Sequence, residues 1–383
     1  MPSGRRLIPV PATRQPLSLL TVDRAVGDLR RGQPVVFQGP GGSAAVVVAA
    51  EAATGQRLDA LRDMAQTEPE IAVTARRAAV LGLSGGGLKV MVLTVADGVT
   101  GELVRELSDP LSKVTVPLRF PVTCREAPTH GCASAAIKLC KTARLLPAAA
   151  IAEVRDPDAA DLAQWAARRN LFITDAGDVF QYDHIAAQFL HPVGEARVPL
   201  QGAEQTRVIA FRPQDGGLEH LALVFGTPSP ESPVLTRLHS ECFTGDLLGS
   251  LRCDCGDQLR GAIREINSRG EGGVLLYLAQ EGRGIGLVNK LRAYTLQDNG
   301  FDTVDANEQL GFDADERVYL PAAQMLRHLG FRRVRLLTNN PAKVDGLIRC
   351  GITVDERVPH AFPSNRHNEV YLRTKVERGG HFS

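Results

Sequence analysis

The 383-residue sequence lacks the features that would assign it to several large classes of protein. It carries no excess charge, because 44 Lys and Arg residues are balanced by 43 Asp and Glu residues. A formal charge of +1 gives no reason to expect nucleic acid or an anionic membrane as a partner, so any anionic ligand must be held by local groups. No stretch approaches about 18 consecutive apolar residues, which argues against a membrane-spanning helix.

An export signal is lacking as well. The basic residues 1–6 are followed by Pro9, Pro11 and Pro16 instead of an apolar stretch. We therefore expect a cytoplasmic protein. Its seven cysteines are an odd number, which favours reduced thiols over a disulfide framework.

The composition and length are those of a globular protein with more than one core. Hydrophobic residues make up 44% and charged residues 23% of the chain, which excludes wholesale disorder, collagen and coiled coils. The length suits two domains of roughly 150–200 residues each. Between Leu190 and Gln201 the apolar periodicity is lost and Pro and Gly gather, so we place the boundary near residue 195. The predicted domains are residues 1–194 and 195–383.

The first half alternates helical and strand-like segments, which predicts an α+β or α/β domain. The spacing of apolar residues predicts helices over 22–31, 133–146 and 161–169, and short apolar runs predict strands over 34–37 and 149–154. The glycine-rich stretch 39–43 must be a turn or loop. Cys124, Cys132 and Cys140 are interpreted as small buried residues.

The second half begins with antiparallel strands and continues with strand–loop–helix units. Strands are predicted over 207–211, 220–225, 234–238, 274–277 and 334–337. The turn Asp215-Gly216-Gly217 joins the first two. The last two lead into the loops 281–286 and 338–341, each followed by a helix. We predict a mixed α/β fold for this domain, and a two-domain α+β or α/β architecture for the chain.

A second cysteine trio, Cys242, Cys253 and Cys255, crowds into fourteen residues. A turn in the intervening segment would let the three thiols converge. Thiolates favour zinc, and three of them leave the fourth tetrahedral position to water, whose pKa zinc lowers toward about 7. Two plainer alternatives stay open: unrelated core cysteines, or a structural zinc whose fourth ligand is His239, His220 or Cys350.

Two loops suit phosphate groups. In 281–286 the glycines let backbone N–H groups approach an anion, and Arg283 adds charge. In 338–341, Pro341 suits the first helical position and Lys343 lies near the helix N-terminus. Either loop alone is weak evidence, but two loops and a metal in one domain favour a nucleoside triphosphate. Taken alone, Asp315-Glu316-Arg317 is a solvated charge run.

Together these residues make the second half resemble GTP cyclohydrolase II, the zinc enzyme that opens the riboflavin pathway. The resemblance runs from about Arg197 to His381 and includes the blocks 239–246, 250–256, 280–286, 289–294, 296–298, 307–312, 315–317 and 336–341. It implies hydrolysis of GTP to 2,5-diamino-6-(5-phospho-ribosylamino)pyrimidin-4-one, formate and pyrophosphate, with one Zn²⁺ per chain and Mg²⁺ on the triphosphate. Two rivals stay open: a non-catalytic GTP-binding regulatory paralogue, and an enzyme that stops at the formylated intermediate.

The resemblance also implies a role for each matching residue. Cys242, Cys253 and Cys255 would ligate zinc, and Tyr294 would serve the hydrolytic steps. Arg317 would attack the α-phosphorus with Asp315 as its activating carboxylate. Because a guanidinium is normally locked as a cation by a pKa above about 12, Arg317 as a stabiliser of phosphate charge stays an alternative. The matching substrate positions are Arg237, Glu241, Gln258, Glu281, Gly282, Arg283, Thr303, Thr338 and Lys343, with Glu241 and Gln258 suited to guanine.

The first half resembles a decayed 3,4-dihydroxy-2-butanone 4-phosphate synthase. The resemblance rests on residues 25–31, 34–37, 46–51, 131–147, 149–154 and 161–172. The family's acidic run matches Gln38–Ala45, which holds no carboxylate, and its Gly-His-Thr-Glu block matches Gly131-Cys132-Ala133-Ser134. We therefore predict no synthase activity. We expect the domain to support or dimerise the protein as a homodimer; a passenger domain and a bifunctional enzyme are the alternatives.

Overall fold

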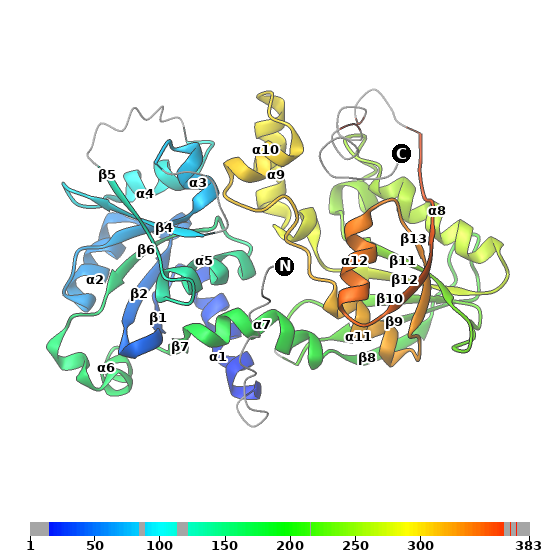
Figure 1. Ribbon diagram of the computed structural model, residues 1–383, viewed down its shortest axis with the longest axis horizontal. Helices are drawn as coiled ribbons and strands as arrows, with labels where there is room; N and C mark the ends of the chain where they lie inside the picture. Colours follow the sequence, from blue (N-terminus) through cyan, green and yellow to red (C-terminus); the bar gives the residue numbers. More distant parts are fainter. Residues whose placement is uncertain are drawn as a thin grey trace, which may run out of the picture. The chain divides into compact units, whose positions relative to one another are not determined.

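The computed structural model describes residues 15–83, 89–112, 122–214 and 216–363, together with Asn368 and Arg373. The chain divides into two compact units, and the described strands form two seven-stranded sheets (Figure 1). Unit 1 comprises Met1–Ile185, Leu291–Phe301 and Asp305–Ala314; unit 2 comprises Ala186–Lys290, Asp302–Val304 and Asp315–Ser383. The predicted mixed α/β fold class is confirmed.

The sheet of unit 1 is almost entirely antiparallel. Its strands are β1 (Val35–Gln38), β2 (Ala44–Ala49), β3 (Glu70–Thr74), β4 (Val90–Val95), β5 (Val122–Glu126), β6 (Ala148–Glu153) and β7 (Ile173–Asp175). They follow the order β5-β4-β3-β6-β2-β1-β7, and only β1 and β7 pair in parallel. The helices of this part are α1 (Gln15–Arg30), α2 (Gly55–Ala65), α3 (Ala75–Val80), α4 (Gly101–Ser108), α5 (Cys132–Thr142), α6 (Leu162–Arg168) and α7 (Ala176–Gln188).

Alternate strand residues supply the core of unit 1. Val46 and Val48 of β2 point to one face and pack with Leu58 and Leu61 of α2 in a single apolar cluster. Helix α5 packs on β3 and β6, and its alanine side chains let it approach the sheet closely. The helix predicted over 22–31 is confirmed within α1, although α1 begins earlier, at Gln15.

The sheet of unit 2 is half antiparallel and half parallel. Its strands are β8 (His191–Arg197), β9 (Thr206–Arg212), β10 (His220–Phe225), β11 (Val234–Ser240), β12 (Gly273–Leu278), β13 (Arg333–Leu337) and β14 (Thr353–Val358), in the order β14-β13-β11-β12-β10-β9-β8. Strands β8, β9, β10 and β12 pair antiparallel; β12, β11, β13 and β14 pair in parallel. The helices of this half of the chain are α8 (Cys255–Ser268), α9 (Leu287–Asp298), α10 (Thr303–Gln309), α11 (Leu320–His328) and α12 (Pro341–Arg349).

Helices cover both faces of the parallel strands in unit 2. On β12, Leu275 packs with Ile266 of α8, whereas its neighbour Leu276 packs with Met325 of α11 and Leu347 of α12. A parallel strand buried on both faces gives a continuous apolar run, which is what made β12 visible in the sequence. The carboxyl ends of β11, β12 and β13 open into the loops that carry most of the predicted site residues, where ligands bind in open α/β sheets.

The segment near residue 195, where the sequence places the domain boundary, forms the strand β8. It pairs with β9 at the edge of the sheet, with a bulge between Pro192 and Gly194, and all seven of its residues are exposed. Proline is tolerated at an edge because its missing N–H faces solvent. The division into compact units falls before β8, so the boundary proposed from the sequence lies inside this strand. Of the predicted turn at 215–217, Asp215 lies outside the described residues.

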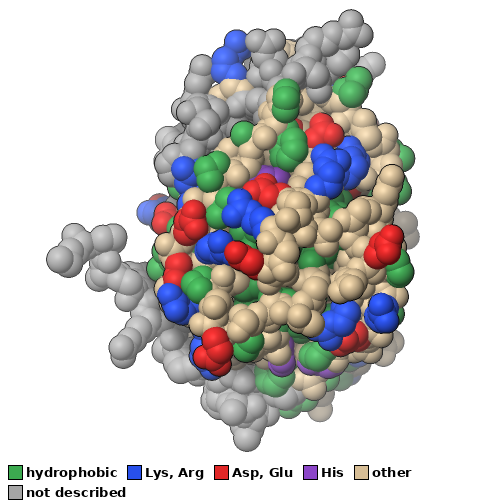
Figure 2. All heavy atoms as spheres, turned by 90° about the vertical axis from the view of Figure 1, so that its right-hand side faces the viewer, with side chains coloured by type: hydrophobic (Ala, Val, Ile, Leu, Met, Phe, Trp, Pro, Cys, Tyr) green, Lys and Arg blue, Asp and Glu red, His purple; other side chains and the backbone are tan. Residues whose placement is uncertain are grey.

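None of the helices in the described ranges combines the length and the apolar character needed to cross a membrane. The face seen in Figure 2 carries basic and acidic side chains interspersed, with no broad patch of one sign. That distribution agrees with the nearly balanced formal charge of the sequence.

Candidate metal centre and active site

The loops that follow β11 bring the three predicted cysteines together. The sulfur atoms of Cys242, Cys253 and Cys255 all lie within 4.8 Å of one another, and those of Cys242 and Cys253 are 3.7 Å apart. Cys242 lies two residues beyond β11, and Cys255 is the first residue of α8. Within the described part of the chain, no other group of three or more His, Cys, Asp and Glu residues is arranged to hold a metal ion.

Gly245 leaves the room that a metal ion between these thiols needs. A Cβ atom on Gly245 would lie 2.8 Å from the Cys253 sulfur and 3.0 Å from the Cys242 sulfur, so only glycine fits here. Its backbone N–H donates to the Cys242 sulfur at 3.4 Å. Three thiol donors in a glycine-lined cradle fit zinc.

The histidine proposed as a fourth ligand has another partner. His239 Nε2 lies 3.0 and 3.1 Å from the two carboxylate oxygens of Asp246, and burial lowers the pKa of the imidazole. The same carboxylate accepts hydrogen bonds from the Cys242 N–H and the Tyr277 hydroxyl, each at 3.0 Å. His239 and Asp246 therefore brace the loop that carries Cys242, and the described group that could hold a metal ion comprises the three cysteines.

Lys290, on α9, is the neighbour of the trio that the sequence did not reveal. Its Nζ lies 3.0 Å from the Cys242 sulfur, 3.0 Å from the Thr244 hydroxyl and 2.9 Å from Glu281 Oε1. The side chains of Lys290 and Glu281 are 10% and 4% exposed, so this ion pair is buried. Hydrogen bonds from the Cys253 and Cys255 thiols, with the Lys290 charge, hold the pKa of Cys242 well below its usual value. These surroundings favour the thiolate form of Cys242.

Glu281 is occupied by protein groups. Besides Lys290, its carboxylate accepts the backbone N–H of Phe243 at 2.6 Å and that of Gly282 at 2.8 Å. These contacts tie the glycine-rich loop to the cysteine loop. The predicted nucleotide-binding residue therefore holds the two loops together in this structure.

Asp315 and Arg317 form the bidentate ion pair that their spacing allows. Arg317 Nε donates to Asp315 Oδ1 at 2.8 Å, Nη2 donates to Oδ2, and the Arg317 backbone N–H donates to Oδ1 at 3.0 Å. Burial would raise the pKa of Asp315, but the hydrogen bonds and charge of Arg317, with the charge of Arg283, hold it below its usual value. Arg317 Nη1 also lies 3.5 Å from the hydroxyl of Ser240, the last residue of β11. The pair is therefore adjacent to the strand that leads to Cys242.

The glycine-rich loop packs directly on the loop of Asp315 and Arg317. Gly282 and Arg283 have positive φ angles of 63° and 60°. A Cβ on Gly284 would lie 3.0 Å from the Glu316 backbone, and the Glu316 N–H donates to the Arg283 carbonyl at 3.0 Å. Only glycine permits this close approach of two backbones. The glycine-rich loop and the loop of Asp315 and Arg317 are therefore packed backbone to backbone.

A network of hydrogen-bonded polar side chains lies near the carboxyl ends of β11 and β13. Arg237 donates to the Leu337 carbonyl at 2.8 Å and to the Gln258 side chain, whose amide donates in turn to Asp254. Burial lowers the pKa of Arg237 to about 10, which still leaves it charged at neutral pH. Lys343, 6% exposed, donates to the Leu238 carbonyl at 2.6 Å. Two buried cations beneath the strand ends favour an anionic ligand.

The remaining predicted residues are spread along the same half of the chain. Thr338 follows β13, is 1% exposed and accepts the Asn340 N–H at 3.0 Å; Glu241 lies beside Cys242, and Thr303 begins α10. Tyr294 lies one helical turn beyond Lys290 on α9, in the part of that helix that belongs to unit 1. Its role in the reaction stays a prediction.

The fold and this site define a mixed α/β protein with three converging thiols, which could hold a metal ion, at the ends of parallel strands. The sequence pattern of a family described as GTP cyclohydrolase II matches residues 191–359. The chain is 53% identical over 364 residues to the GTP cyclohydrolase-2 of Azospirillum brasilense, an alignment that covers 95% of this chain and 94% of that protein. The chain belongs to the GTP cyclohydrolase II family, and the predicted resemblance of its second half is confirmed.

Further relatives are named for riboflavin biosynthesis. The riboflavin biosynthesis protein RibBA of Phocaeicola vulgatus is 35% identical over 398 residues, covering 95% of this chain and 98% of that protein. The RibBA of Synechocystis is 44% identical over 259 residues, covering 66% and 46%. Among solved structures, RibBX, a two domain 3,4-dihydroxy-2-butanone 4-phosphate synthase from A. baumannii, matches with a TM-score of 0.37 and 19% identity, covering 89% of this chain and 99% of that one.

Proposed function

We propose that this chain hydrolyses GTP to 2,5-diamino-6-(5-phospho-ribosylamino)pyrimidin-4-one, formate and pyrophosphate, the first step of riboflavin biosynthesis, with one zinc ion held by Cys242, Cys253 and Cys255. Membership of the family supports the reaction. The observation that carries the site is the convergence of three thiols beside β11, whose last residue contacts Arg317. When bound, zinc supplies a Lewis acid and water activation at the purine.

The protein's own groups organise the two ends of the substrate. We assign the buried Arg237 and Lys343, with Arg283, to the binding of the nucleotide and its triphosphate, on which we expect Mg²⁺. We assign the recognition of guanine to Glu241 and Gln258, the latter held in place by hydrogen bonds at both ends of its amide. Glu281, Gly282, Thr303 and Thr338 complete the proposed substrate contacts, and Tyr294 the hydrolytic step.

For Arg317 the geometry favours charge stabilisation over nucleophilic attack. A bidentate carboxylate partner holds the guanidinium as a cation, which has no free lone pair with which to attack phosphorus. The carboxylate of Asp315 fixes the positive guanidinium of Arg317 near the end of β11. There it would stabilise the negative charge that develops on the leaving pyrophosphate. Asp315 positions Arg317 in this proposal.

Zinc analysis paired with GTP turnover tests the proposal. The purified chain should contain about one zinc per chain, and GTP should yield the diaminopyrimidine absorbance together with formate and pyrophosphate. Pyrophosphate and a formylated product without free formate would indicate an enzyme that stops early. GTP binding with no new absorbance would indicate a regulatory paralogue and would overturn the proposal.

For unit 1 we propose a supporting role without synthase activity. The segment Gln38–Ala45 carries no carboxylate, and Gly41 and Gly42 take positive φ angles of 68° and 79° in its turn. Without the carboxylates of that acidic run, this segment offers no ligand for a hard cation and no base for an enediol. Incubation with ribulose 5-phosphate should give no four-carbon phosphate above a heat-killed control, and light scattering should report a homodimer.

A further inference from the structure

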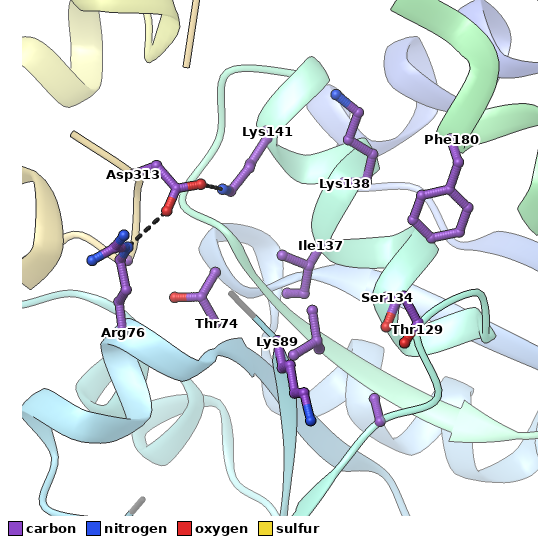
Figure 3. A pocket seen from close by; sticks show the side chains of 13 residues that line it. Thr74, Arg76, Lys89, Thr129, Ser134, Ile137, Lys138, Lys141, Phe180 and Asp313 are labelled. Atoms are coloured by element: carbon purple, nitrogen blue, oxygen red, sulfur yellow. Dashed lines mark hydrogen bonds and ion pairs between the residues drawn. The ribbon is translucent and has the colours of Figure 1, made fainter. Parts of the chain in front are cut away.

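Unit 1 contains a cavity that the proposed reaction does not use. Its volume is about 220 Å³, and its lining comes from β3, α3, the start of β4, the segment after β5, α5 and α7, together with Gly311 and Asp313 (Figure 3). None of residues 38–45 lines it, whereas Ser134, the last residue of the block that matches Gly-His-Thr-Glu, does. The volume is below the range of roughly 300–1,000 Å³ for drug-sized ligands and suits a smaller molecule.

The lining of this cavity is strongly basic. Arg76, Lys89, Lys138 and Lys141 line it, against the single carboxylate of Asp313. Each cation has a carboxylate partner, but Glu126, Asp183 and Glu308 are not part of the lining. A concave surface with an excess of one charge concentrates the field and favours an anion.

Two of these cations already hold an oxyanion. Arg76 Nε lies 2.7 Å and Lys141 Nζ 3.4 Å from the carboxylate oxygens of Asp313. Burial would raise the pKa of Asp313, but Lys141 and Arg76 hold it below its usual value. The Arg76 Nη1 donates to Glu308 at 2.6 Å, while its Nη2 has no hydrogen-bond partner among the described residues. A ligand oxyanion beside Asp313 would find that donor and two fixed positive charges.

The opposite side of the cavity suits a ring. In Figure 3, Phe180, Ser134 and Thr129 lie across the cavity from Arg76 and Asp313, with Ile137 between the two sides. The Phe180 ring is held edge-on against His130, with ring centres 5.2 Å apart. Ile137 and Phe180 offer apolar contact, and the hydroxyl groups offer hydrogen bonds. One end of the cavity thus suits an anionic group of a ligand, and the other end suits a flat apolar ring.

We propose that this cavity binds a small phosphate monoester with a ring-shaped body, its phosphate toward Arg76 and Lys141 and its ring against Phe180. The probe is phenyl phosphate, titrated by calorimetry into the full-length protein at constant ionic strength. The Arg76→Gln/Lys141→Gln double variant should weaken binding at least tenfold. Arg62→Gln, an arginine of the same unit that pairs with Asp59 and Glu68 outside the cavity, should leave binding unchanged.

A second variant separates the ring from the phosphate and guards against misfolding. Phe180→Leu should weaken the binding of phenyl phosphate several-fold and leave that of inorganic phosphate unchanged. Far-UV circular dichroism establishes that each variant is folded. Binding that survives the double variant unchanged, or that responds equally to Arg62→Gln, would place the ligand elsewhere and overturn the proposal. So would the absence of any binding heat with millimolar probe.

Discussion

Two cysteines beside glycine loops, Cys132 in unit 1 and Cys242 in unit 2, show how neighbours decide what a thiol does. Cys132 begins α5, and a Cβ on Gly39 would lie 2.9 Å from its sulfur, much as Gly245 makes room beside Cys242. The Cys132 thiol lies 3.7 Å from the Phe37 carbonyl, and burial raises its pKa. The pKa of Cys242 is shifted in the opposite direction by two further thiols and Lys290.

Both thiols lie where a loop meets a helix, so this position does not explain the opposite pKa shifts. The two sites differ in the number of neighbouring thiols and in the presence of a lysine charge. Of the three cysteines interpreted from the sequence as buried, only Cys140 is; Cys124 and Cys132 are partly exposed because they lie nearer the protein surface. A lone, partly buried thiol whose pKa is raised stays protonated and packs as a small group. Three thiols with a buried lysine favour a thiolate, the form that binds metal. The predictions below test whether this contrast holds, from the largest expected effect to the smallest.

Cys253→Ser should abolish the function of the metal centre. The hydroxyl of serine is a poor zinc ligand, and the sulfur that it replaces lies 3.7 Å from that of Cys242. We expect loss of bound zinc by elemental analysis and a fall in GTP ring opening of at least about 10³-fold. Cys132→Ser is the matched control and should keep both zinc and activity. If Cys253→Ser loses metal yet opens the ring, the trio has no catalytic role.

Arg317→Lys should lower kcat by about 10²-fold, because lysine cannot form the paired hydrogen bonds that fix Arg317 against Asp315. Zinc content should be unchanged, which separates this variant from the cysteine variant. Arg333→Lys is the control, because Arg333 pairs with Asp355 on the same sheet at an exposed position. Equal activity of the two variants would remove Arg317 from the reaction.

Lys290→Met should weaken zinc binding by roughly 10- to 100-fold, because it removes the charge that supports the Cys242 thiolate. It should also destabilise the protein by about 3–5 kcal/mol, since it leaves the buried Glu281 without its cation. Lys290→Met/Glu281→Gln should recover part of the stability and none of the zinc affinity. Recovery of both in the double variant would mean that Lys290 acts only through Glu281. Competition with a chelator measures the zinc affinity, and urea unfolding measures the stability.

The sequence predicted those parts of the site whose residues lie close together along the chain. Cys253 and Cys255, or Asp315 and Arg317, lie two residues apart, so local spacing alone brings their side chains together. Lys290 was missed because its partners, Cys242 and Thr244, lie more than forty residues away, and only the parallel pairing of β11 with β12 unites them. Because Asn289 and Arg292 also lie in this stretch of helix, Lys290 gave no distinct signal in the sequence.

The sequence revealed several strands of the fold but not all of them. Strands β10 and β12 show as apolar runs, whereas β8 has all seven residues exposed and gives no periodic signal. The assignment of residues 305–314 to unit 1 was also not predictable. It depends on contacts such as Arg76 with Glu308 and Asp313, more than two hundred residues apart in sequence.

Asp313 of unit 1 and Asp315 of unit 2 allow the smallest and most direct comparison of the two units. Cationic partners, Lys141 and Arg76 at Asp313 and Arg317 at Asp315, lower the pKa of both carboxyl groups, although burial alone would raise it. A carboxyl with a lowered folded pKa stabilises the folded state above its unfolded value of about 3.9, and this stabilisation is lost as the pH falls through the folded value. Asp313→Asn and Asp315→Asn should therefore cost stability at pH 7, and each difference from wild type should shrink toward zero as the pH falls below about 4.

The midpoints of urea unfolding measure these differences in stability. The protein is first treated with a chelator, because metal and protons compete for the cysteine thiolates and bound metal would add a pH dependence of its own. Asp97→Asn, at an exposed position of unit 1, corrects for the loss of one negative charge. Asp315 holds one guanidinium in a bidentate pair, whereas Asp313 pairs with Lys141 and with Arg76, which it shares with Glu308. Both variants should therefore respond to pH with the same sign but not the same size. A difference that grows as the pH falls would mean that the protonated carboxyl is the stabilising form, contrary to the ion pairs seen in both units.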